Sequence, residues 1–167
     1  MLAAVSIIGH HNSGKTRLIA QLIPILVDRG YRVGTAKHAP HLEEIDPSDS
    51  DSAVHRSAGA ERVLLLGETT AALVWELDDT EGLEEMLERL FSDCDIVLVE
   101  GAKHGPLPKI EVYRHHRGRG IVHEPLAGEI DVECVVTDDA PALPDGVRVL
   151  SPRSPFEIAE FIEERFC

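Results

Sequence analysis

Residues 9–16, Gly-His-His-Asn-Ser-Gly-Lys-Thr, decide the fold because they match the phosphate-binding loop pattern G-x-x-x-x-G-K-[ST]. An apolar run of strand-like composition, 2–8, comes before them, and a helical pattern comes after. In such a loop the glycines let backbone N–H groups face one centre, the lysine reaches the outer phosphates, and the threonine hydroxyl ligates Mg²⁺. A helix starting at Thr16 would add its positive end. The sequence therefore predicts a site for nucleotide phosphates.

Strand and helix patterns alternate along the chain, which is typical of a mainly parallel sheet with helices on its faces. Apolar residues recur at helical spacing through Asp28, where Gly30 ends the helix, and Pro24 predicts a kink or a local break. Ser154-Pro155-Phe156-Glu157 predicts a capping box at the last helix. Further strands are expected at 32–36, 60–66, 70–77, 95–100, 109–114, 132–137 and 148–150, and further helices at 51–58 and 82–90.

These elements predict an α/β fold of the P-loop NTPase class: a twisted, mainly parallel sheet flanked by helices, with an antiparallel strand pair formed by 60–66 and 70–77. The length of 167 residues suits one domain spanning 1–167. The net charge of -14 argues against a general role on nucleic acid or on an anionic membrane, because both require a positive surface.

The cysteines are too few and too scattered for a disulfide framework or a CxxC metal site, and we expect neutral thiols at Cys94 and Cys134. Apolar stretches stay shorter than the roughly 18 residues that a membrane span needs. We therefore expect a soluble, cytoplasmic protein.

A second nucleotide signal lies at Glu100, which ends the apolar strand pattern at 95–100 and precedes Gly101. A carboxylate at the end of a buried strand is the usual partner of a phosphate loop, because Mg²⁺ prefers oxygen ligands opposite the phosphates. The alternative is a surface acid that follows a strand. Together with the phosphate loop, the position favours a metal-related role.

At this point several blocks resemble one family, the molybdopterin-guanine dinucleotide biosynthesis protein B (MobB) group of phosphate-loop NTPases. The blocks are 11–16, Lys37-His38-Ala39-Pro40-His41, Asp46 with Asp51-Ser52, Arg56 with Ala58-Gly59-Ala60, 95–103, and Pro108-Lys109-Ile110-Glu111. The resemblance implies a GTP-binding accessory protein, usually dimeric and with weak GTPase activity, for nucleotide attachment in molybdenum cofactor maturation. Its implied partners are a molybdenum cofactor guanylyltransferase and a molybdopterin intermediate.

The chain departs from the family pattern at three places. Asp49-Ser50 stands where such proteins commonly have Gly-Lys, Arg17 where a second threonine is frequent, and Ala102 where an aromatic residue is frequent. The first departure replaces a flexible, cationic element by an acidic one.

Three sets of site residues follow from the motifs and the resemblance. The catalytic set is Lys15, His38 and Asp46, of which the last two would orient water or sense the γ-phosphate. The metal set is Thr16, Asp46 and Glu100. The set for GTP is Gly9, His10, His11, Asn12, Ser13, Gly14, Lys15, Thr16, Arg17, Lys37, Lys103 and Asp138.

Guanine is often distinguished by a carboxylate that accepts hydrogen bonds from its ring N–H and its amino group. The strand pattern at 132–137 is followed by Asp138 and Asp139, and we favour Asp138 over Asp139 for this role. The alternative is that both are solvated loop acids.

For several residues two interpretations stay open. His38 and His41 have metal-ligand spacing, yet they are also consistent with loop histidines that bond to phosphate, water or backbone. Lys109 could contact phosphate or lie in solvent. The basic turn at 115–119 could hold a pterin phosphate or dock on a partner, or form an exposed hairpin tip.

Three other functions therefore stay open. One is an ATP-dependent carboxylate-activating ligase resembling dethiobiotin synthetase, which is suggested by Glu100-Gly101-Ala102. The others are a metallochaperone GTPase that uses the histidines, and a binding module without turnover.

Overall fold

A computed structural model describes residues 2–39, 45–77, 81–115, 123–139 and 141–167 of the chain. Two compact units divide them: the first combines 1–38 with 83–167, and the second is 39–82. The phosphate-loop sequence and Glu100 belong to the first unit, whereas Asp46 belongs to the second. The prediction of one domain over 1–167 stays a prediction.

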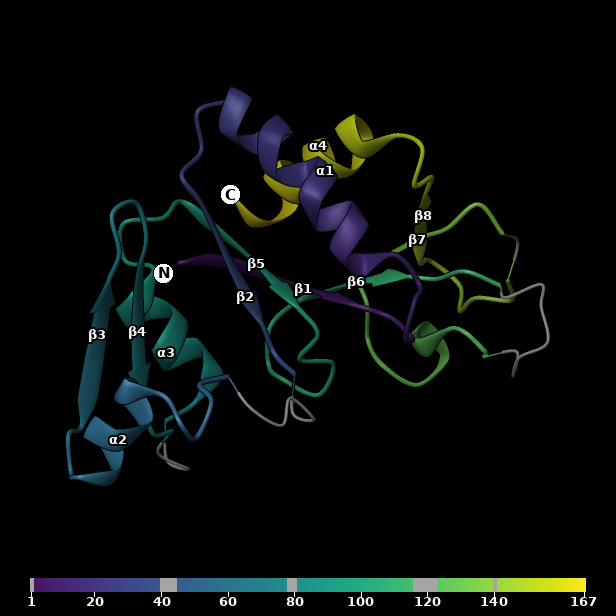
Figure 1. Cartoon of the computed structure of the whole chain (residues 1–167). Helices are drawn as coiled ribbons and strands as arrows, with labels where there is room; N and C mark the ends of the chain where they lie inside the picture. The colour runs from purple at the N-terminus through teal and green to yellow at the C-terminus, as the bar shows by residue number, and fades with distance from the viewer. Residues whose placement is uncertain (1, 40–44, 78–80, 116–122, 140) are drawn as a thin grey trace. The chain divides into compact units, whose positions relative to one another are not determined.

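The first unit is built on a six-stranded parallel sheet with the order β2-β5-β1-β6-β7-β8 (Figure 1). Its strands are β1 (Ala3–Ile8), β2 (Val33–Lys37), β5 (Ile96–Glu100), β6 (Lys109–Val112), β7 (Cys134–Val136) and β8 (Arg148–Leu150). Because every pairing is parallel, the carboxyl ends of these strands meet at one edge of the sheet. In such sheets ligands bind at that edge, next to the strand where the order of connections reverses. That strand is β1, which lies between β5 and β6.

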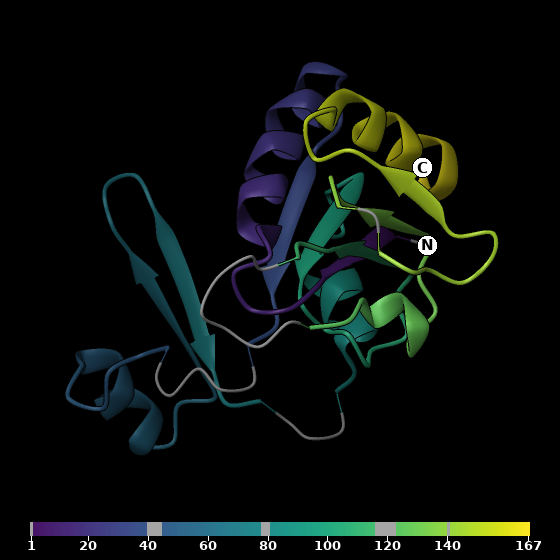
Figure 2. The ribbon, with the colours of Figure 1, turned by 90° about the vertical axis from the view of Figure 1, so that its right-hand side faces the viewer.

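Helices cover both faces of this sheet (Figure 2). On one face lie α1 (Lys15–Asp28) and α4 (Pro155–Phe166), which also contact each other. The opposite face carries α3 (Leu83–Leu90) and the short 3₁₀ helix η1 (Leu126–Gly128). The predicted α/β class, with its mainly parallel sheet and flanking helices, is confirmed.

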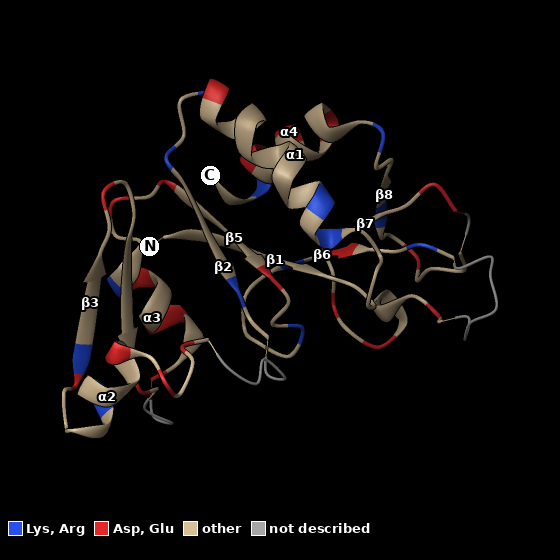
Figure 3. Cartoon of the chain, in the orientation of Figure 1, with Lys and Arg blue, Asp and Glu red and all other residues tan. Residues whose placement is uncertain are grey.

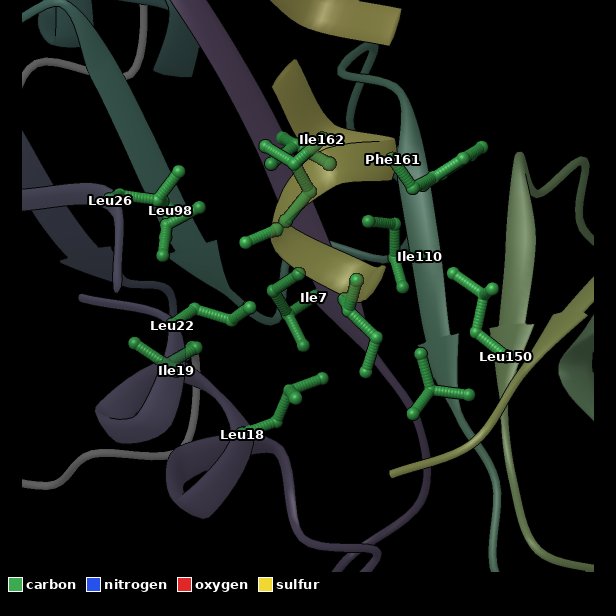
Figure 4. Close-up of a cluster of buried hydrophobic side chains, with 14 of the residues drawn as sticks. Ile7, Leu18, Ile19, Leu22, Leu26, Leu98, Ile110, Leu150, Phe161 and Ile162 are labelled. Carbon is green, nitrogen blue, oxygen red and sulfur yellow. The ribbon is translucent and has the colours of Figure 1, made fainter. Parts of the chain in front are cut away.

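The main core lies between the sheet and the helices α1 and α4 (Figure 4). Leu18, Leu22 and Leu26 follow the i, i+4 spacing of one helical face, and all three are buried. They meet apolar side chains of β1, β5 and β6, such as Ile7 and Ile110. This packing holds the first turn of α1 against the sheet, next to the loop that joins β1 to α1.

Helix α1 runs through Pro24 as one element, so the chain has no break at this residue, and the predicted kink stays a prediction. Both Pro24 and Ala20 lie on the exposed side of the helix. Proline has no N–H, so the carbonyl of Ala20 lacks its usual helical donor. Because this side of the helix is exposed, water can take the place of that donor.

The predicted capping box at α4 is also wrong. Ser154 is the N-cap residue, with φ -114° and ψ 63°, and its side chain makes no cap hydrogen bond. A serine that caps a helix usually has an extended backbone, which turns Oγ toward the free N–H groups. The Ser154 carbonyl, and not its side chain, bonds to the helix: it accepts a hydrogen bond from the N–H of Ile158 at 3.2 Å.

The thiol of Cys134 is fully buried in β7, and this burial raises its pKa to about 12. Burial also raises the pKa of the Cys94 thiol. The prediction of neutral thiols at these two positions is confirmed. Among the described residues, no helix combines the length and the apolar content needed to cross a membrane.

The second unit contains α2 (Asp51–Ser57) and an antiparallel pair of strands, β3 (Arg62–Leu66) and β4 (Ala71–Trp75). The predicted antiparallel pair is confirmed. Ser50 caps α2, because its backbone is extended and its Oγ accepts a hydrogen bond from the N–H of Ala53 at 3.0 Å. The serine that departs from the family pattern thus begins a helix.

Candidate functional site

The loop between β1 and α1 has the backbone conformation that its glycines predict. Gly9, Asn12 and Gly14 all have positive φ, at 142°, 60° and 106°. A Cβ atom at Gly9 would lie only 2.3 Å from the carbonyl oxygen of Val112 in β6. Glycine is therefore required where the loop passes the neighbouring strand, and asparagine is a residue that tolerates a left-handed conformation.

The N-terminus of α1 offers donors that the described part of the chain does not use. Its N-cap residue is Gly14, which has no capping side chain, and its first turn contains no acidic residue. Ser13 is 5% exposed, and its buried hydroxyl has no hydrogen-bond partner among the described residues. Unused N–H groups at a helix N-terminus, together with a buried free hydroxyl, fit an anion such as phosphate.

Lys15 lies folded over this loop. Its Nζ donates to the carbonyl oxygens of Gly9 and His10, at 3.0 and 2.8 Å. Burial lowers the pKa of Lys15, while the nearby Glu100 carboxylate opposes the shift and Lys37 adds to it. The ammonium group thus binds only backbone carbonyls among the described residues, and phosphate oxygens could replace these acceptors.

Thr16 and Glu100 meet at the carboxyl edge of the sheet. The Thr16 hydroxyl donates to Oε2 of Glu100 at 2.8 Å, and Nζ of Lys37 lies 3.7 Å from Oε1. Lys37 is the register partner of Glu100 in the β2–β5 pair, so the sheet itself sets this contact. Figure 3 shows basic segments at the start of α1 and at the end of β2. A hydroxyl and a carboxylate beside a phosphate loop form an oxygen set suited to Mg²⁺.

The turn after Glu100 keeps the carboxylate at the end of β5. Gly101 has φ 94°, and a Cβ atom there would lie 2.7 Å from the carbonyl oxygen of His38. The N–H of His38 in turn donates to the carbonyl oxygen of Glu100 at 2.9 Å. The backbone of His38, which directly follows β2, is therefore bonded to the carboxyl end of β5.

A pocket of ≈ 220 Å³ adjoins the other side of the phosphate loop. Its wall includes Gly14 and Arg17 from the start of α1, Arg114 after β6, Asp138 after β7 and Arg153 after β8. The predicted base-recognition residue thus shares a pocket with the phosphate loop.

Asp138 is held in place by two donors. Its Oδ1 accepts from Ser151 Oγ at 2.7 Å, and its Oδ2 accepts from Arg153 Nε at 2.8 Å. The Ser151 hydrogen bond is the main cause that lowers the pKa of Asp138, and Arg153 acts in the same direction. Asp139 has a different partner: its Oδ2 accepts a hydrogen bond from the backbone N–H of His115 at 2.6 Å. An ionised carboxylate with acceptor capacity left over suits a ligand that donates N–H groups.

Asp46 makes its contacts inside the second unit. Its Oδ1 accepts from the hydroxyls of Ser50 and Ser52, and its Oδ2 accepts from Arg56 Nε and Nη2 at 3.2 and 2.8 Å. The side chain is 9% exposed, and the Ser52 hydrogen bond is the main cause that lowers its pKa. Arg56 also pairs with Glu76. These bonds fasten the segment before α2 to the helix, and the predicted roles of Asp46 in catalysis and metal binding stay predictions.

Two lysines have contrasting surroundings. Lys103 is exposed, whereas Nζ of Lys109 donates to the carbonyl oxygen of Leu107 at 2.8 Å. The histidine and basic-turn hypotheses rest partly on Pro40, His41, His116, Arg117 and Arg119, which lie outside the described residues. Within the described residues, no group of three or more His, Cys, Asp and Glu side chains could hold a metal ion.

Sequence reasoning missed Arg114 and Arg153, which line the pocket, and Ser151, which bonds to Asp138. Each lies within three residues of a strand's carboxyl end, which is a usable signal, because strand ends of a parallel sheet meet at one edge. The order of the strands, which the sequence does not state, decides that the ends of β6, β7 and β8 lie beside the phosphate loop.

Comparisons with known proteins point to one family. The family model described as molybdopterin guanine dinucleotide synthesis protein B matches residues 4–138. A molybdopterin-guanine dinucleotide biosynthesis adapter protein of Escherichia coli is 33% identical, with 98% of this chain and 93% of that protein covered. The protein of the same name from Haemophilus influenzae is 32% identical, with 95% and 86% covered.

A crystal structure of a molybdopterin-guanine biosynthesis protein B superposes with a TM-score of 0.73 at 27% identity. The superposition covers 96% of this chain and 98% of the other.

Replacing Gly9 by alanine should distort the phosphate loop, because the new Cβ atom would meet the Val112 carbonyl oxygen. We expect Gly9→Ala to lower the free energy of unfolding by more than about 1 kcal/mol. Gly128→Ala is the matched control, since nothing lies within 4 Å of its Cβ position. Urea unfolding of both variants measures the difference, and equal midpoints would contradict the close approach of the loop to β6.

Proposed function

The chain belongs to the molybdopterin guanine dinucleotide synthesis protein B family, and we propose that it is a GTP-binding adapter with slow, Mg²⁺-dependent GTPase activity. The family has its role in molybdenum cofactor biosynthesis. The observation that carries the nucleotide proposal is the phosphate loop, whose helix lacks a cap and whose Ser13 hydroxyl is buried without a partner in the described chain.

The residues of the loop have distinct parts in this proposal. The N–H groups at the start of α1 and the Lys15 ammonium bind the β- and γ-phosphates, and Lys15 exchanges its carbonyl acceptors for phosphate oxygens. Thr16 and Glu100 hold Mg²⁺ directly or through water, which supplies charge neutralisation at the phosphates. His38 and Asp46 are proposed to sense the γ-phosphate or to orient the attacking water.

Guanine recognition is assigned to Asp138. Guanine donates from its ring N–H and from its amino group, and a carboxylate can accept both hydrogen bonds. The Ser151 and Arg153 contacts orient the carboxylate, while Arg17 and Arg114 line the same pocket. This arrangement supports GTP over ATP, whose base presents an acceptor where guanine has the ring N–H. An ATP preference would instead favour the carboxylate-activating ligase.

The relatives are described as adapter proteins, which supports a function exerted together with partners. The proposed partners are a molybdenum cofactor guanylyltransferase and its molybdopterin intermediate. Slow turnover suits this role, because an adapter acts through the state of its bound nucleotide.

A homodimer is the proposed assembly. Leu64, Leu66 and Leu73 share one face of the β3–β4 pair, since Leu64 lies opposite Leu73 and Leu66 is two residues further along β3. All three side chains are exposed. A two-stranded sheet is marginally stable in water, and an exposed apolar face on it is typical of a surface that another chain covers. The second copy is the proposed occupant.

Lys15→Ala should remove the binding of Mg²⁺·GTP and leave the fold intact, because the lysine bonds only to loop carbonyls. The measurement is isothermal titration calorimetry with GTP, with and without Mg²⁺. Arg165→Ala is the control for loss of one positive charge, since Arg165 lies on α4 and pairs with Glu133, the residue before β7. Equal affinity of Lys15→Ala and the wild type would exclude the phosphate site.

Asp138→Asn should exchange the base preference from GTP to XTP. The amide offers an N–H₂ donor to the C2 carbonyl of xanthine, whereas guanine presents its own amino group there. We expect a loss of GTP affinity of about tenfold or more, which corresponds to one or two hydrogen bonds. Asp139→Asn is the matched control in the next position. Retained GTP preference in Asp138→Asn, measured by competition binding, would contradict the assignment.

Leu66→Lys should convert a dimer to the 18.3 kDa monomer, because it places a charge in the apolar face of β3. Sedimentation equilibrium measures the mass, and Val27→Lys is the control at an exposed apolar residue of α1. A wild-type protein that stays monomeric at every concentration would overturn the proposed assembly.

A further inference from the structure

A carboxyl group is fully buried at Glu111 in β6, a residue with no role in the site described above. Its two oxygens accept backbone hydrogen bonds from Leu126 N–H at 2.7 Å and from Ala127 N–H at 2.9 Å. Burying an acidic group is costly unless it is well bonded, so its presence in a central strand calls for a specific role.

The two amides belong to the start of η1, and Glu111 therefore fixes where this turn lies. Leu126 and Ala127 are themselves buried against Ile8 and Val135, on the face of the sheet opposite α1. The segment that enters η1, 123–127, is called the strap here.

The strap reaches the phosphate loop at its other end. The imidazole ring of His123 stacks on that of His10, with 4.2 Å between ring centroids and 14° between ring planes. Nε2 of His10 also lies 3.1 Å from the carbonyl oxygen of Glu124. The hydroxyl of Tyr113, which follows β6, donates to the carbonyl oxygen of His123 at 3.3 Å. The strap is thus bonded to β6 at one end and to a loop residue at the other.

His10 is the loop residue whose carbonyl oxygen accepts the shorter of the two Lys15 hydrogen bonds, at 2.8 Å. Its side chain bonds to the strap while its backbone bonds to Lys15. A continuous set of contacts therefore leads from Glu111 through η1 and His123 to His10 and Lys15.

We propose that Glu111 is a positioning residue for the phosphate loop, acting through the strap on His10. The inference rests on the proposed nucleotide function of that loop. Glu111 touches neither the loop nor a ligand site; it holds the backbone that keeps His10, and hence the carbonyls around Lys15, in one arrangement before phosphate binds. Preorganisation of this kind raises affinity because less order has to be created on binding.

The test compares the wild type, Glu111→Gln, His123→Ala and the double variant. Glu111→Gln keeps the shape of the side chain but turns an N–H₂ group toward one of the two strap amides. His123→Ala removes the stack on His10 without touching the buried carboxyl group. Glu129→Gln is the matched control, since Glu129 is an exposed acid at the end of η1.

Two readouts are measured on these proteins: Mg²⁺·GTP affinity by calorimetry, and amide hydrogen exchange of 9–18 and 123–127 without nucleotide. Each single variant should bind GTP about tenfold more weakly, the factor for one lost hydrogen bond in Glu111→Gln and for one lost ring stack in His123→Ala. The double variant should bind no more weakly than either single one, because both changes break the same set of contacts. Exchange in the loop should rise in both single variants and stay unchanged in Glu129→Gln.

Wild-type affinity in His123→Ala, or additive losses in the double variant, would overturn the proposal. A Glu111→Gln protein that unfolds leaves His123→Ala to decide the question. Failure of the wild type to bind GTP would refute the proposed function instead, and loop exchange in the free variants would still test the strap.

Discussion

The close passage of the phosphate loop over β6 is the constraint on which the rest of this protein depends. A backbone that leaves β1 and passes within reach of the Val112 carbonyl oxygen has room only for Gly9, and it must then turn through left-handed conformations to enter α1. This path aims the free N–H groups of the helix at the carboxyl edge of the sheet. The neighbours of β1 then decide what lies around them: β5 brings Glu100 on one side, and β6 brings Arg114 on the other.

Charge is arranged locally in a chain whose net charge is -14. Glu100 lies between the Thr16 hydroxyl and the Lys37 ammonium. The charges of Glu100 and Lys37 both act on the pKa of Lys15. Without a cation the carboxylate is stabilised by these neighbours, and the same neighbours suit a triphosphate with its metal ion. An acidic protein can bind a polyanion in this way because the decisive charges lie within a few ångströms, where screening by salt is weak.

In the second unit, the start of α2 is held by side-chain hydrogen bonds. Ser50 caps α2 and bonds to Asp46, whose other oxygen is held by Arg56. Ser50 therefore links the start of α2 to the carboxylate of Asp46. These contacts stabilise the start of the helix within this unit.

The fold class, the phosphate loop and most strands could be predicted from the amino-acid sequence. The reason is that these depend on local features: glycines at required positions, apolar periodicity and short connections. The sequence also placed Glu100 and Asp138 near the carboxyl ends of strands, since Glu100 is the last residue of β5 and Asp138 lies two residues after β7. The predicted cap at Ser154 was wrong, because the backbone of this residue is not extended and its side chain makes no cap hydrogen bond. At Pro24 the helix continues without a break. The strand order could not be predicted and follows from long-range packing. The same packing brings Ser151 and Arg153 to Asp138, and it connects Glu111 to His10 through η1 and His123. These contacts join residues far apart in the chain, and no local pattern encodes which strand ends become neighbours.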